Sequence, residues 1–545
     1  MNRVDQLRHP AWIVAGASLW MTTAGNAPLW RALGHLGLLD GAAGWTLAGG
    51  LGLLVWAGLA ALLSLLAWRW TLKPAVVLLL LATACASYFM LRYGIVVDAG
   101  MLTNVLQTDA RESADLLSPG LALTVLALAG VPAWLLWRQP VAYGRWQRQL
   151  LRNPAMASAC LLLVVVAVLV SFQPLASAMR NHRELRYLIN PLNAVYALGR
   201  TAARPLERDG SRMLPLGEDG RLGAAHAARA RPPLLLLVLG ETGRAGNFGL
   251  NGYARPTTPE LERAGVASFR NVWSCGTSTA ASVPCMFSHL GRDGFERRTS
   301  EVEGLLDVLQ RAGLAVLWVD NQSGCKGVCD RVPHVSTAQG SDPRLCPGGE
   351  CLDEVMLEGL DRRIDALPAG QRARGVVVVL HQMGSHGPAY SKRSPAALKR
   401  FLPECTDTAL QDCSREALVN AYDNSIAYTD HFLARSIVWL QRHADSADAA
   451  MVYVADHGES LGENNLFLHG LPYAIAPDVQ KRVPWISWLS GGYRSRSGIG
   501  AACLEAQRDA PLSHDNYFHS VLGLLDVQSA VYRRELDVYA RCTAP

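Results

Sequence analysis

Long apolar segments in the first third of the chain constrain its fold more than any other feature. A helix needs about 20 residues, at ~1.5 Å each, to cross the ~30 Å apolar core of a bilayer. Five segments approach that length, at residues 11–30, 46–67, 75–94, 119–137 and 156–174. Because every backbone polar group must be satisfied inside a membrane, we expect five transmembrane helices.

The first of these segments is the least apolar, because it contains Thr22, Thr23 and Asn26. A removable signal peptide is therefore a competing interpretation of this segment. No clean small-x-small cleavage site follows it, which favours an uncleaved helix.

Cationic residues are distributed unequally between the loops that join the segments. One side carries Arg3, Arg8, Arg69, Lys73, Arg138, Arg145, Arg148 and Arg152, and the other carries only Arg31, Arg92 and Arg111. Since cations favour cytoplasmic loops, we expect the N-terminus in the cytoplasm. After an odd number of crossings, everything beyond about residue 175 lies outside the cytoplasm, so we expect the second half of the chain to be exported.

The distribution of the cysteines also favours export of the second half of the chain. Ten of the twelve lie beyond residue 270, and stable disulfides belong to oxidising compartments. Spacing suggests the pairs Cys275 with Cys285, Cys325 with Cys329, Cys346 with Cys351, Cys405 with Cys413, and Cys503 with Cys542, but spacing leaves the connectivity open. Structural zinc or a redox dithiol is the alternative, and the absence of a Cys-x-x-Cys motif favours disulfides.

Composition further divides the chain into three parts. Residues 1–175 are expected to form a transmembrane domain, residues 176–231 exported connector helices and a linker, and residues 232–545 an exported soluble domain. The formal net charge is +5 without a basic stripe or an aromatic platform, so the sequence gives no indication of nucleic-acid binding.

Short apolar runs alternate with helical patterns from residue 233 onward. The runs are 234–239, 315–319, 376–380, 450–455 and 484–489, and the helical patterns lie at about 259–265, 301–312, 352–366, 416–443 and 513–524. This alternation predicts an α/β sandwich with a mostly parallel sheet, whose functional loops gather at the carboxyl ends of its strands.

Polar residues follow three of these apolar runs directly. Glu241 ends the first run, His381 and His386 follow the third, and Asp456-His457 ends the fourth. Adjacent oxygen and nitrogen donors at strand ends are typical of a metal site along one edge of a parallel sheet. The sequence therefore predicts a metalloenzyme.

A hydroxyl-rich turn with cysteines on both flanks, Cys275-Gly-Thr-Ser-Thr279-Ala-Ala-Ser-Val-Pro-Cys285, leads into a predicted helix. The start of a helix favours anions through its free N–H groups, which suits a phosphoryl oxygen near Thr279. For Thr277 and Ser278, ordinary helix capping is an equally good interpretation.

Several stretches of the chain resemble the membrane-bound phosphoethanolamine transferases, the family that includes the lipid A modifying enzymes and the mobile colistin-resistance proteins. They are Gly-Glu241-Thr-Gly-Arg-Ala-Gly-Asn-Phe-Gly-Leu-Asn-Gly-Tyr253, Cys-Gly-Thr-Ser-Thr279-Ala, Gly-Ser-His386-Gly-Pro and Ala-Asp456-His457-Gly-Glu459-Ser. Tyr93 to Asp98, Asn104 to Thr108 and Asn181 to Pro191 match membrane and connector segments of that family, so the resemblance covers nearly the whole chain.

The resemblance implies a catalytic domain of the alkaline phosphatase and sulfatase type. It also implies a zinc ion held by Glu241, Asp456, His457 and the hydroxyl of Thr279, with Thr279 as the nucleophile. Two carboxylates, an imidazole and a hydroxyl are suitable ligands for tetrahedral zinc. Zinc lowers the pKa of bound water from 15.7 to about 7, and the same effect would activate a threonine, which alone is a poor nucleophile.

The implied reaction transfers phosphoethanolamine from phosphatidylethanolamine to a phosphate of lipid A through a phosphoethanolamine-threonine ester, and so confers resistance to polymyxin and other cationic peptides. By resemblance, Lys326, His386 and His469 contact the phosphate or a second zinc ion, and Glu459 lies nearby. Gln322 occupies a substrate-associated position at which some relatives have asparagine. The sequence leaves open whether one zinc ion or two are bound, and we expect a monomer.

Other polar residues have two interpretations. Asn104, Thr108 and Glu112 follow the third apolar segment, where they would seat the donor headgroup or form a solvated loop face. His381 and Asp430 are interpreted as polar core residues rather than metal ligands.

Two rival functions remain. Transfer to a lipopolysaccharide core sugar or another periplasmic acceptor, or hydrolysis by a related sulfatase-fold enzyme, keeps the fold and changes the chemistry. A sulfatase requires Cys or Ser followed by x-Pro-x-Arg, whereas Ser282-Val-Pro-Cys-Met286 lacks the arginine. A membrane-anchored binding module with an inactive site is disfavoured, because a degenerate site usually loses a ligand.

Overall fold

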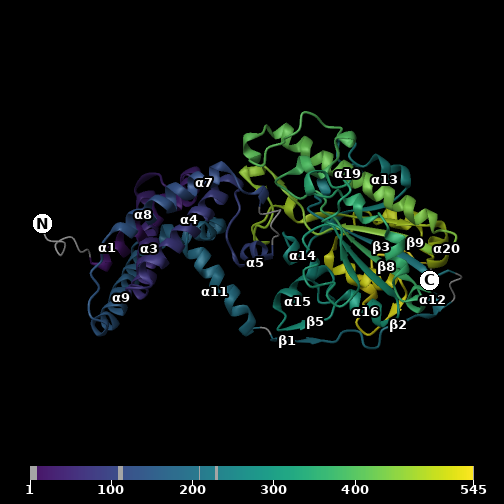
Figure 1. Cartoon of the computed structure of the whole chain (residues 1–545), viewed down its shortest axis with the longest axis horizontal. Coiled ribbons are helices and arrows are strands. Elements are labelled where there is room, and N and C mark those ends of the chain that lie inside the picture. Colours follow the sequence, from purple (N-terminus) through teal and green to yellow (C-terminus); the bar gives the residue numbers. More distant parts are fainter. Residues whose placement is uncertain (1–8, 108–113, 208, 228–230, 544–545) are drawn as a thin grey trace. The chain divides into compact units, whose positions relative to one another are not determined.

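The computed structural model of the chain describes residues 9–107, 114–207, 209–227 and 231–543. Thr108, Glu112, Arg3, Arg8 and Arg111 lie outside these residues. The chain forms two compact units: residues 1–102 and 116–203 make unit 1, and residues 103–115 and 204–545 make unit 2 (Figure 1).

Unit 1 is built from helices. They are α1 (Pro10–Thr22), α2 (Ala27–His35), α3 (Gly41–Leu65), α4 (Leu72–Tyr93), α7 (Pro119–Val125), α8 (Val131–Arg138), α9 (Trp146–Val170) and α10 (Phe172–Asn181); α5 (Ala99–Gln107) and α11 (Leu192–Glu207) run on into unit 2. A π-helical turn, Leu126–Gly130, joins α7 to α8. Among the described residues, four helices are long and apolar enough to cross a membrane: Gly41–Leu65, Leu72–Tyr93, Pro119–Arg138 and Trp146–Val170.

The segment predicted as a helix at 11–30 is divided. Helix α1 ends at Thr22, a short 3-10 turn follows, and α2 begins at Ala27. Asn26 is buried in the break, where its side chain donates to the Met21 carbonyl and accepts the N–H of Asn190. The side chain of Asn26 thus satisfies the Met21 carbonyl in place of a regular helix bond, and Pro28 lies in the first turn of α2, where its missing N–H costs no helix bond.

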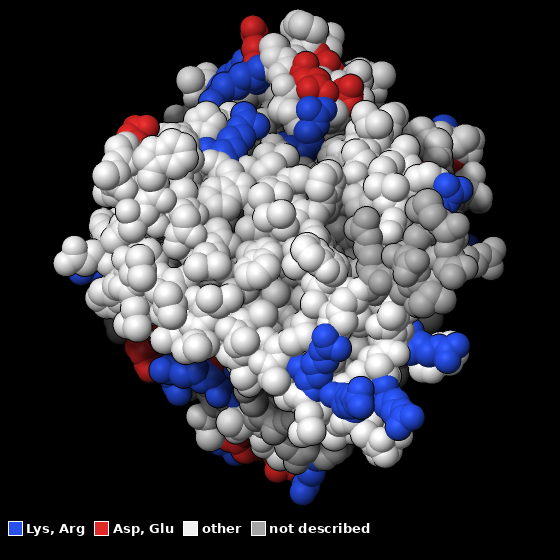
Figure 2. All heavy atoms as spheres, turned by 90° about the vertical axis from the view of Figure 1, so that its left-hand side faces the viewer, with Lys and Arg blue, Asp and Glu red and all other residues white. Residues whose placement is uncertain are grey.

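Exposed side chains of the long helices are largely Leu, Val and Trp. The face of the molecule in Figure 2 is broad and free of charge in its middle, with Lys and Arg at its edges. Such a surface is stable against hydrocarbon and would be costly in water.

Unit 2 is built around an eight-stranded mixed sheet. Its strands, in spatial order, are β13 (Leu512–Ser513), β4 (Ala267–Trp273), β12 (Arg482–Leu489), β9 (Asp448–Ala455), β3 (Pro233–Gly240), β8 (Val376–His381), β6 (Ala315–Asp320) and β7 (His334–Ser336). Strand β12 runs antiparallel to both of its neighbours, and the other pairings are parallel. Strands β3, β8 and β9 are buried along their whole length, which explains their uninterrupted apolar sequences.

Three short two-stranded sheets complete the strands of unit 2. They pair β1 (Asp209–Leu214) with β5 (Ser300–Val302), β2 (Arg221–Leu222) with β14 (Val527–Gln528), and β10 (Ser460–Leu461) with β11 (Phe467–Leu468).

Helices cover both faces of the large sheet. In Figure 1, α13 (Pro259–Ala264) and α19 (Arg415–Arg442) lie on one side of it, and α15 (Gly291–Arg297) and α16 (Leu305–Arg311) lie on the other. The remaining α-helices of unit 2 are α12 (Ala224–Ala227), α14 (Thr279–Met286), α17 (Leu360–Asp365), α18 (Ala369–Arg372), α20 (Gly491–Ser497), α21 (Ala501–Ala506) and α22 (Tyr517–Leu524).

All five predicted strands are present, and the prediction of an α/β sandwich is confirmed. The short edge strands β7 and β13 and the strand β4 were not predicted from the sequence. The helical pattern at 352–366 is divided between a 3-10 turn, Asp353–Met356, and α17, because Gly359 has a left-handed backbone (φ 66°). The pattern at 513–524 likewise begins as a 3-10 turn, His514–Asn516, before α22.

The register of the central strands brings the polar strand ends together. Gly240 of β3 pairs with Ala455 of β9, and Leu239 pairs with His381 of β8. Glu241 and Asp456 therefore leave adjacent parallel strands at the same level.

Unit 2 also contains five disulfides. They join Cys275 to Cys285, Cys325 to Cys329, Cys346 to Cys351, Cys405 to Cys413, and Cys503 to Cys542. These pairs coincide with those that the spacing suggested. Cys85 and Cys160, both in helices of unit 1, have free thiols.

Candidate metal centre and active site

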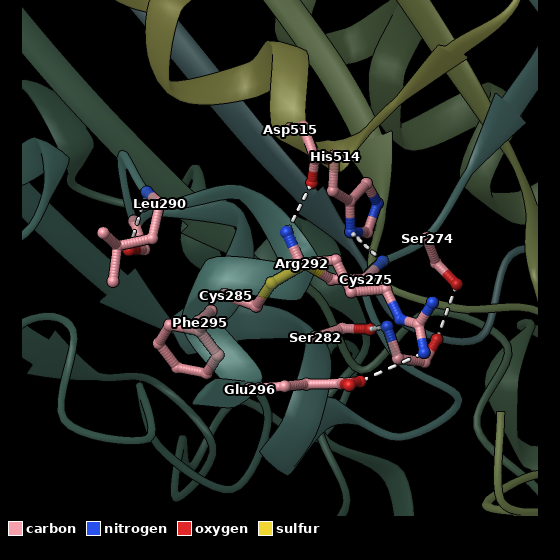
Figure 3. The surroundings of a disulfide bond; sticks show 12 residues. Ser274, Cys275, Ser282, Cys285, Leu290, Arg292, Phe295, Glu296, His514 and Asp515 are labelled. Carbon is pink, nitrogen blue, oxygen red and sulfur yellow. Dashed lines mark hydrogen bonds and ion pairs between the residues drawn. A yellow bond between two sulfur atoms is a disulfide. The ribbon is translucent and has the colours of Figure 1, made fainter. Parts of the chain in front are cut away.

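The turn before α14 is fixed on both flanks of Thr279. The disulfide between Cys275 and Cys285 closes it, and the N–H of Gly276 donates to the hydroxyl of Ser282 at 2.9 Å (Figure 3). Thr279 is the first residue of the helix and is buried. Ser278 precedes it with extended backbone and makes no side-chain cap, so the free N–H groups of the first turn stay close to the Thr279 hydroxyl.

His514 ties this turn to the large sheet. Its Nδ1 accepts the N–H of Cys275 at 3.0 Å, and its Nε2 donates to the carbonyl of Ala455 at 3.0 Å (Figure 3 shows the bond to Cys275). Burial lowers the pKa of His514 to about 4, so the ring is neutral and can play both roles. The turn before α14 and the end of β9 are thus connected through one imidazole.

Thr277 connects the same turn to the loop that carries His469. The Thr277 hydroxyl donates to the carbonyl of Leu471 at 2.6 Å, and its own carbonyl accepts the N–H of Gly470 at 2.8 Å. The capping interpretation of Thr277 is therefore replaced by a contact between two loops.

The hydroxyl of Thr279 lies directly against Glu241. It donates to the carboxylate at 2.9 Å from Oε2 and 3.1 Å from Oε1. The hydroxyl of Thr242 donates to Oε1 at 2.8 Å, and Thr242 has a left-handed backbone (φ 59°) that turns the chain sharply after β3. Glu241 is therefore oriented by two hydroxyl groups.

Asp456 and His457 lie beside Glu241 and are fully buried. Asp456 accepts the N–H groups of Thr242 and His457 through Oδ1, at 3.1 and 2.7 Å. His457 Nδ1 faces the carbonyl of Gly458 at 2.9 Å, which fixes the tautomer with Nε2 unprotonated in the neutral ring. That Nε2 lies 3.3 Å from Glu241 Oε1 and 3.4 Å from Asp456 Oδ2.

These three side chains, which we call the ligand cluster (Glu241, Asp456 and His457), fit a metal ion. One ligand atom from each lies within 4.8 Å of the others. Asp456 Oδ2 and His457 Nε2 are buried and make no hydrogen bond to any described residue. Buried polar atoms without partners are costly, and a cation would satisfy both at once. Oxygen and nitrogen donors of this kind suit zinc.

Electrostatics within the ligand cluster agree with this fit. Burial and the neighbouring Glu241 raise the pKa of Asp456 to about 7. Burial lowers the pKa of His457, but the two carboxylates outweigh it and raise the pKa to about 10. The cluster thus retains a proton near neutral pH, which a bound cation would replace.

Two more histidines extend the site away from the ligand cluster. The ring of His469 lies 4.3 Å from that of His457, and the ring of His386 lies 5.5 Å from that of His469, measured between centroids. His469 Nδ1 is 3.2 Å from Glu459 Oε2. Burial raises the pKa of Glu459 to about 8. The structure therefore brings together Thr279, the ligand cluster, His386, His469 and Glu459.

Gln322 and Lys326 lie on the loop after β6, one strand beyond β8 at the same edge of the sheet. The amide oxygen of Gln322 accepts the hydroxyl of Ser323 at 2.7 Å. Lys326 Nζ donates to the hydroxyl of Ser323 at 2.8 Å and to the carbonyl of Gln107 at 3.4 Å. The bonds of Lys326 anchor it to its own loop and to Gln107.

Residues that the sequence did not single out hold the site loops. Asp353 accepts the N–H groups of Met383 and Gly384, at 2.8 and 3.1 Å, and so shapes the loop to His386. The hydroxyl of Tyr422 donates to the carbonyl of Thr242 at 2.6 Å. Neither residue stands in a motif near its partner, and no local pattern indicates them.

The two polar residues that were interpreted as core are buried. His381 Nδ1 lies 2.9 Å from Asp320 Oδ2. Asp430 accepts the N–H groups of Glu260 and Leu261 at the start of α13, each at 2.9 Å, which is a helix-capping role.

Two family models match the chain. Phosphoethanolamine transferase EptA/EptB matches residues 55–206, and Sulfatase matches residues 233–527. The chain is 41% identical over 491 residues to phosphoethanolamine transferase EptA of Escherichia coli strain K12, covering 88% of this chain and 87% of that protein. It is 39% identical over 474 residues to phosphatidylethanolamine transferase Mcr-1 of Escherichia coli, covering 84% of each.

Solved structures of phosphoethanolamine transferases are also similar to this chain. The integral membrane lipooligosaccharide phosphoethanolamine transferase A of Neisseria meningitidis superimposes with a TM-score of 0.91 at 35% identity, and 98% of each chain is covered. The C-terminal periplasmic domain of phosphoethanolamine transferase EptC of Campylobacter jejuni superimposes with a TM-score of 0.52 at 37% identity, over 60% of this chain and 97% of that one.

Proposed function

The chain belongs to the phosphoethanolamine transferase family, and from this premise we propose that it moves phosphoethanolamine from phosphatidylethanolamine to a phosphate of lipid A through an ester on Thr279. A relative of 27% identity, Kdo(2)-lipid A phosphoethanolamine 7''-transferase of Escherichia coli, is named for a lipid A acceptor modified at a 7'' position. Fewer anionic charges on lipid A would weaken the binding of polymyxin, so the proposed activity would confer resistance.

One observation supports the role of Thr279 above others. Its hydroxyl donates to both oxygens of Glu241, beside two buried atoms without hydrogen bonds, Asp456 Oδ2 and His457 Nε2. A hydroxyl whose hydrogen is directed to a carboxylate keeps its lone pairs available to an incoming phosphorus. Because Thr279 also begins α14, the N–H groups of the first turn would face a phosphoryl oxygen.

Zinc is the metal that we propose for this site. Glu241, Asp456, His457 and the Thr279 hydroxyl would hold it, and when bound it would supply Lewis acidity and neutralise developing negative charge. Whether a second ion binds near His386 and His469 stays open in this proposal.

The first half of the reaction forms a bond between Thr279 Oγ1 and phosphorus and breaks the bond from phosphorus to the diacylglycerol oxygen. The hydroxyl proton moves toward Glu241, and the departing oxygen takes a proton to become diacylglycerol. In the second half, a lipid A phosphate oxygen forms a bond to the same phosphorus, the bond from phosphorus to Thr279 Oγ1 breaks, and Thr279 regains its proton from Glu241. Lys326, His386, His469, Gln322 and Glu459 are proposed to contact substrate, because phosphoryl transfer depends on positioning and charge stabilisation.

The proposed reaction also implies the membrane and the compartment in which the protein would act. Residues 1–175 would anchor a monomer in the bacterial inner membrane, and residues 232–545 would act in the periplasm, joined by the connector 176–231. Four described helices of sufficient length and disulfides confined to residues 275–542 support this placement. Both lipids would then be accessible from the membrane.

Mass spectrometry of lipid A tests the function. Cells that express the wild type should show a phosphoethanolamine mass increment, and cells that express Thr279→Ala should not. An increment with both would remove Thr279 from its role. An increment with neither, together with normal protein levels, would favour another acceptor or a hydrolase.

A further inference from the structure

Arg393 makes three contacts that reach two functional parts of unit 2. It is the last residue of the 3-10 turn Tyr390–Arg393, and its side chain is only 5% exposed. Its Nε donates to the carbonyl of His386 at 2.9 Å, one terminal nitrogen donates to Glu350 at 2.7 Å, and the other lies 3.4 Å from Asp115. Every nitrogen of this guanidinium therefore has an oxygen partner.

Lys392 adds a second cation to the same carboxylates. Its Nζ is 2.7 Å from Asp115 and 2.8 Å from Glu350. Asp115 is 11% exposed and Glu350 is 24% exposed, whereas the Lys392 side chain is 48% exposed. We call Asp115, Glu350, Lys392 and Arg393 the four-charge cluster. Its two positive and two negative charges alternate, so the cluster is neutral and satisfied within itself.

Asp115 lies at the point where the chain leaves unit 2 for unit 1. It is the last residue of the short stretch 103–115 that belongs to unit 2, and Leu116 begins the second stretch of unit 1, which leads into α7. The chain therefore enters the helices of unit 1 directly after Asp115. Asp115 is itself bonded by Lys392, which lies 277 positions further along the chain, shortly after His386. Glu350 alone would neutralise much of the charge of Arg393. The added bond to Asp115 therefore connects the segment that ends at residue 115 with the turn that carries Arg393, and these two segments need not otherwise meet.

We propose that Arg393 is a positioning residue that holds the His386 loop in register with Asp115, so that the histidine meets the phosphate of the phospholipid donor. The proposal rests on the proposed function for the identity of that donor. It assigns no contact with substrate to Arg393 or Asp115, because both act through His386. Lysine could not replace the arginine, since a single ammonium on a flexible stem cannot reproduce a planar fork with three separate partners.

The kinetic test asks whether the effects of Asp115 and Arg393 variants on kcat/KM depend on the presence of His386. The full chain, reconstituted with zinc in nanodiscs that contain fluorescent phosphatidylethanolamine, is assayed for release of diacylglycerol. Asp115→Asn and Arg393→Lys should each lower kcat/KM by about tenfold, the expected scale for one lost charge-assisted hydrogen bond. In a His386→Ala background neither change should lower it further, and Lys392→Met, which leaves Arg393 in place, should change little in either background. If Asp115→Asn or Arg393→Lys lowered kcat/KM by the same factor in the His386→Ala background as in the wild type, the proposal would be overturned.

Hydrogen exchange provides a test that does not depend on activity. Amides of residues 383–387 should exchange faster in Asp115→Asn than in the wild type, while Lys392→Met leaves their exchange unchanged. Unchanged exchange in Asp115→Asn would overturn the positioning role even if the enzyme is active. If the wild type releases no diacylglycerol but the exchange result holds, the donor assignment fails and the connection from Asp115 to His386 stands.

Discussion

Unit 2 contains two groups of charged side chains, one buried and one partly buried, that differ in how their polar atoms are satisfied. In the ligand cluster, Glu241 is bonded by hydroxyls, but Asp456 Oδ2 and His457 Nε2 make no hydrogen bond to described residues. In the four-charge cluster, all three nitrogens of Arg393 have oxygen partners. Both groups are rich in carboxylates, and composition alone does not separate them.

The difference indicates what each group is for. Unpaired buried atoms that converge on one point are costly to keep unless a ligand completes them, so the ligand cluster is suited to binding and chemistry. A closed set of ion pairs contributes fixed geometry instead, and its loss leaves an uncompensated charge. Variants of the first group should therefore change activity more than stability, and variants of the second should change stability more strongly.

Thr279→Ala should have the largest effect. Transfer should fall by more than about 10⁴-fold, because the oxygen that we propose as the nucleophile is absent, while the melting temperature of the metal-free protein stays close to that of the wild type. Activity and intact-protein mass spectrometry measure this, and Thr279→Ser is the control that retains a hydroxyl. A phosphoethanolamine adduct on Thr279→Ala would contradict the assignment.

Asp456→Asn should weaken zinc binding by more than about 100-fold, because it removes one of the proposed ligands. The metal-free protein should not be destabilised, since the change removes a buried carboxylate beside Glu241. Calorimetric zinc titration and thermal unfolding with and without chelator measure both effects. Asp430→Asn is the matched control, because that buried aspartate caps α13 and should leave zinc affinity unchanged. Equal zinc affinity in Asp456→Asn and wild type would refute the metal site.

His514→Gln should change the response of stability to acid. The folded pKa of His514, about 4, lies below its ordinary value of 6.5 because the ring is buried. Folding therefore disfavours protonation, so the stability that this group contributes is present above pH 6.5 and is lost as the pH falls toward 4. The loss amounts to up to about 3 kcal/mol, from 1.36 kcal/mol per pKa unit.

Thermal unfolding of metal-free protein between pH 8 and pH 4 measures this effect without interference from metal release. His514→Gln should start less stable at pH 8, because it loses bonds to the Cys275 and Ala455 backbone, and should then show a shallower decline. Parallel curves for the two proteins would show that His514 is not the acid-sensitive group.

Arg393→Met and Lys392→Met should separate the buried part of the four-charge cluster from its exposed part. Removing Arg393 leaves two carboxylates with one cation, and should lower the free energy of unfolding by about 2 kcal/mol. Removing Lys392, which is half exposed, should cost less than about 1 kcal/mol. Thermal unfolding of the two variants side by side measures the difference. Equal losses would mean that burial of Arg393 has no energetic role.

Local sequence determined much of the fold and of the site. Four of the five predicted strands are continuous apolar runs and the fifth is interrupted only by Ser487, and such runs are buried wherever helices cover both faces of a sheet. Glu241 and Asp456-His457 were identifiable because polar residues directly follow such runs. Four disulfides join cysteines 4 to 10 positions apart, which the short connecting chain keeps close in space.

Only the tertiary structure determined how these pieces are held. His514 binds Cys275 across 239 positions, Tyr422 binds Thr242 across 180, and Lys392 binds Asp115 across 277. The break near Asn26 likewise depends on Asn190, 164 positions away. Periodicity and spacing describe the burial of each segment but carry no information about which distant segment will supply a hydrogen-bond partner. The chemistry of the site is therefore visible in the chain, while its geometry exists only once the strands are paired and the loops are connected.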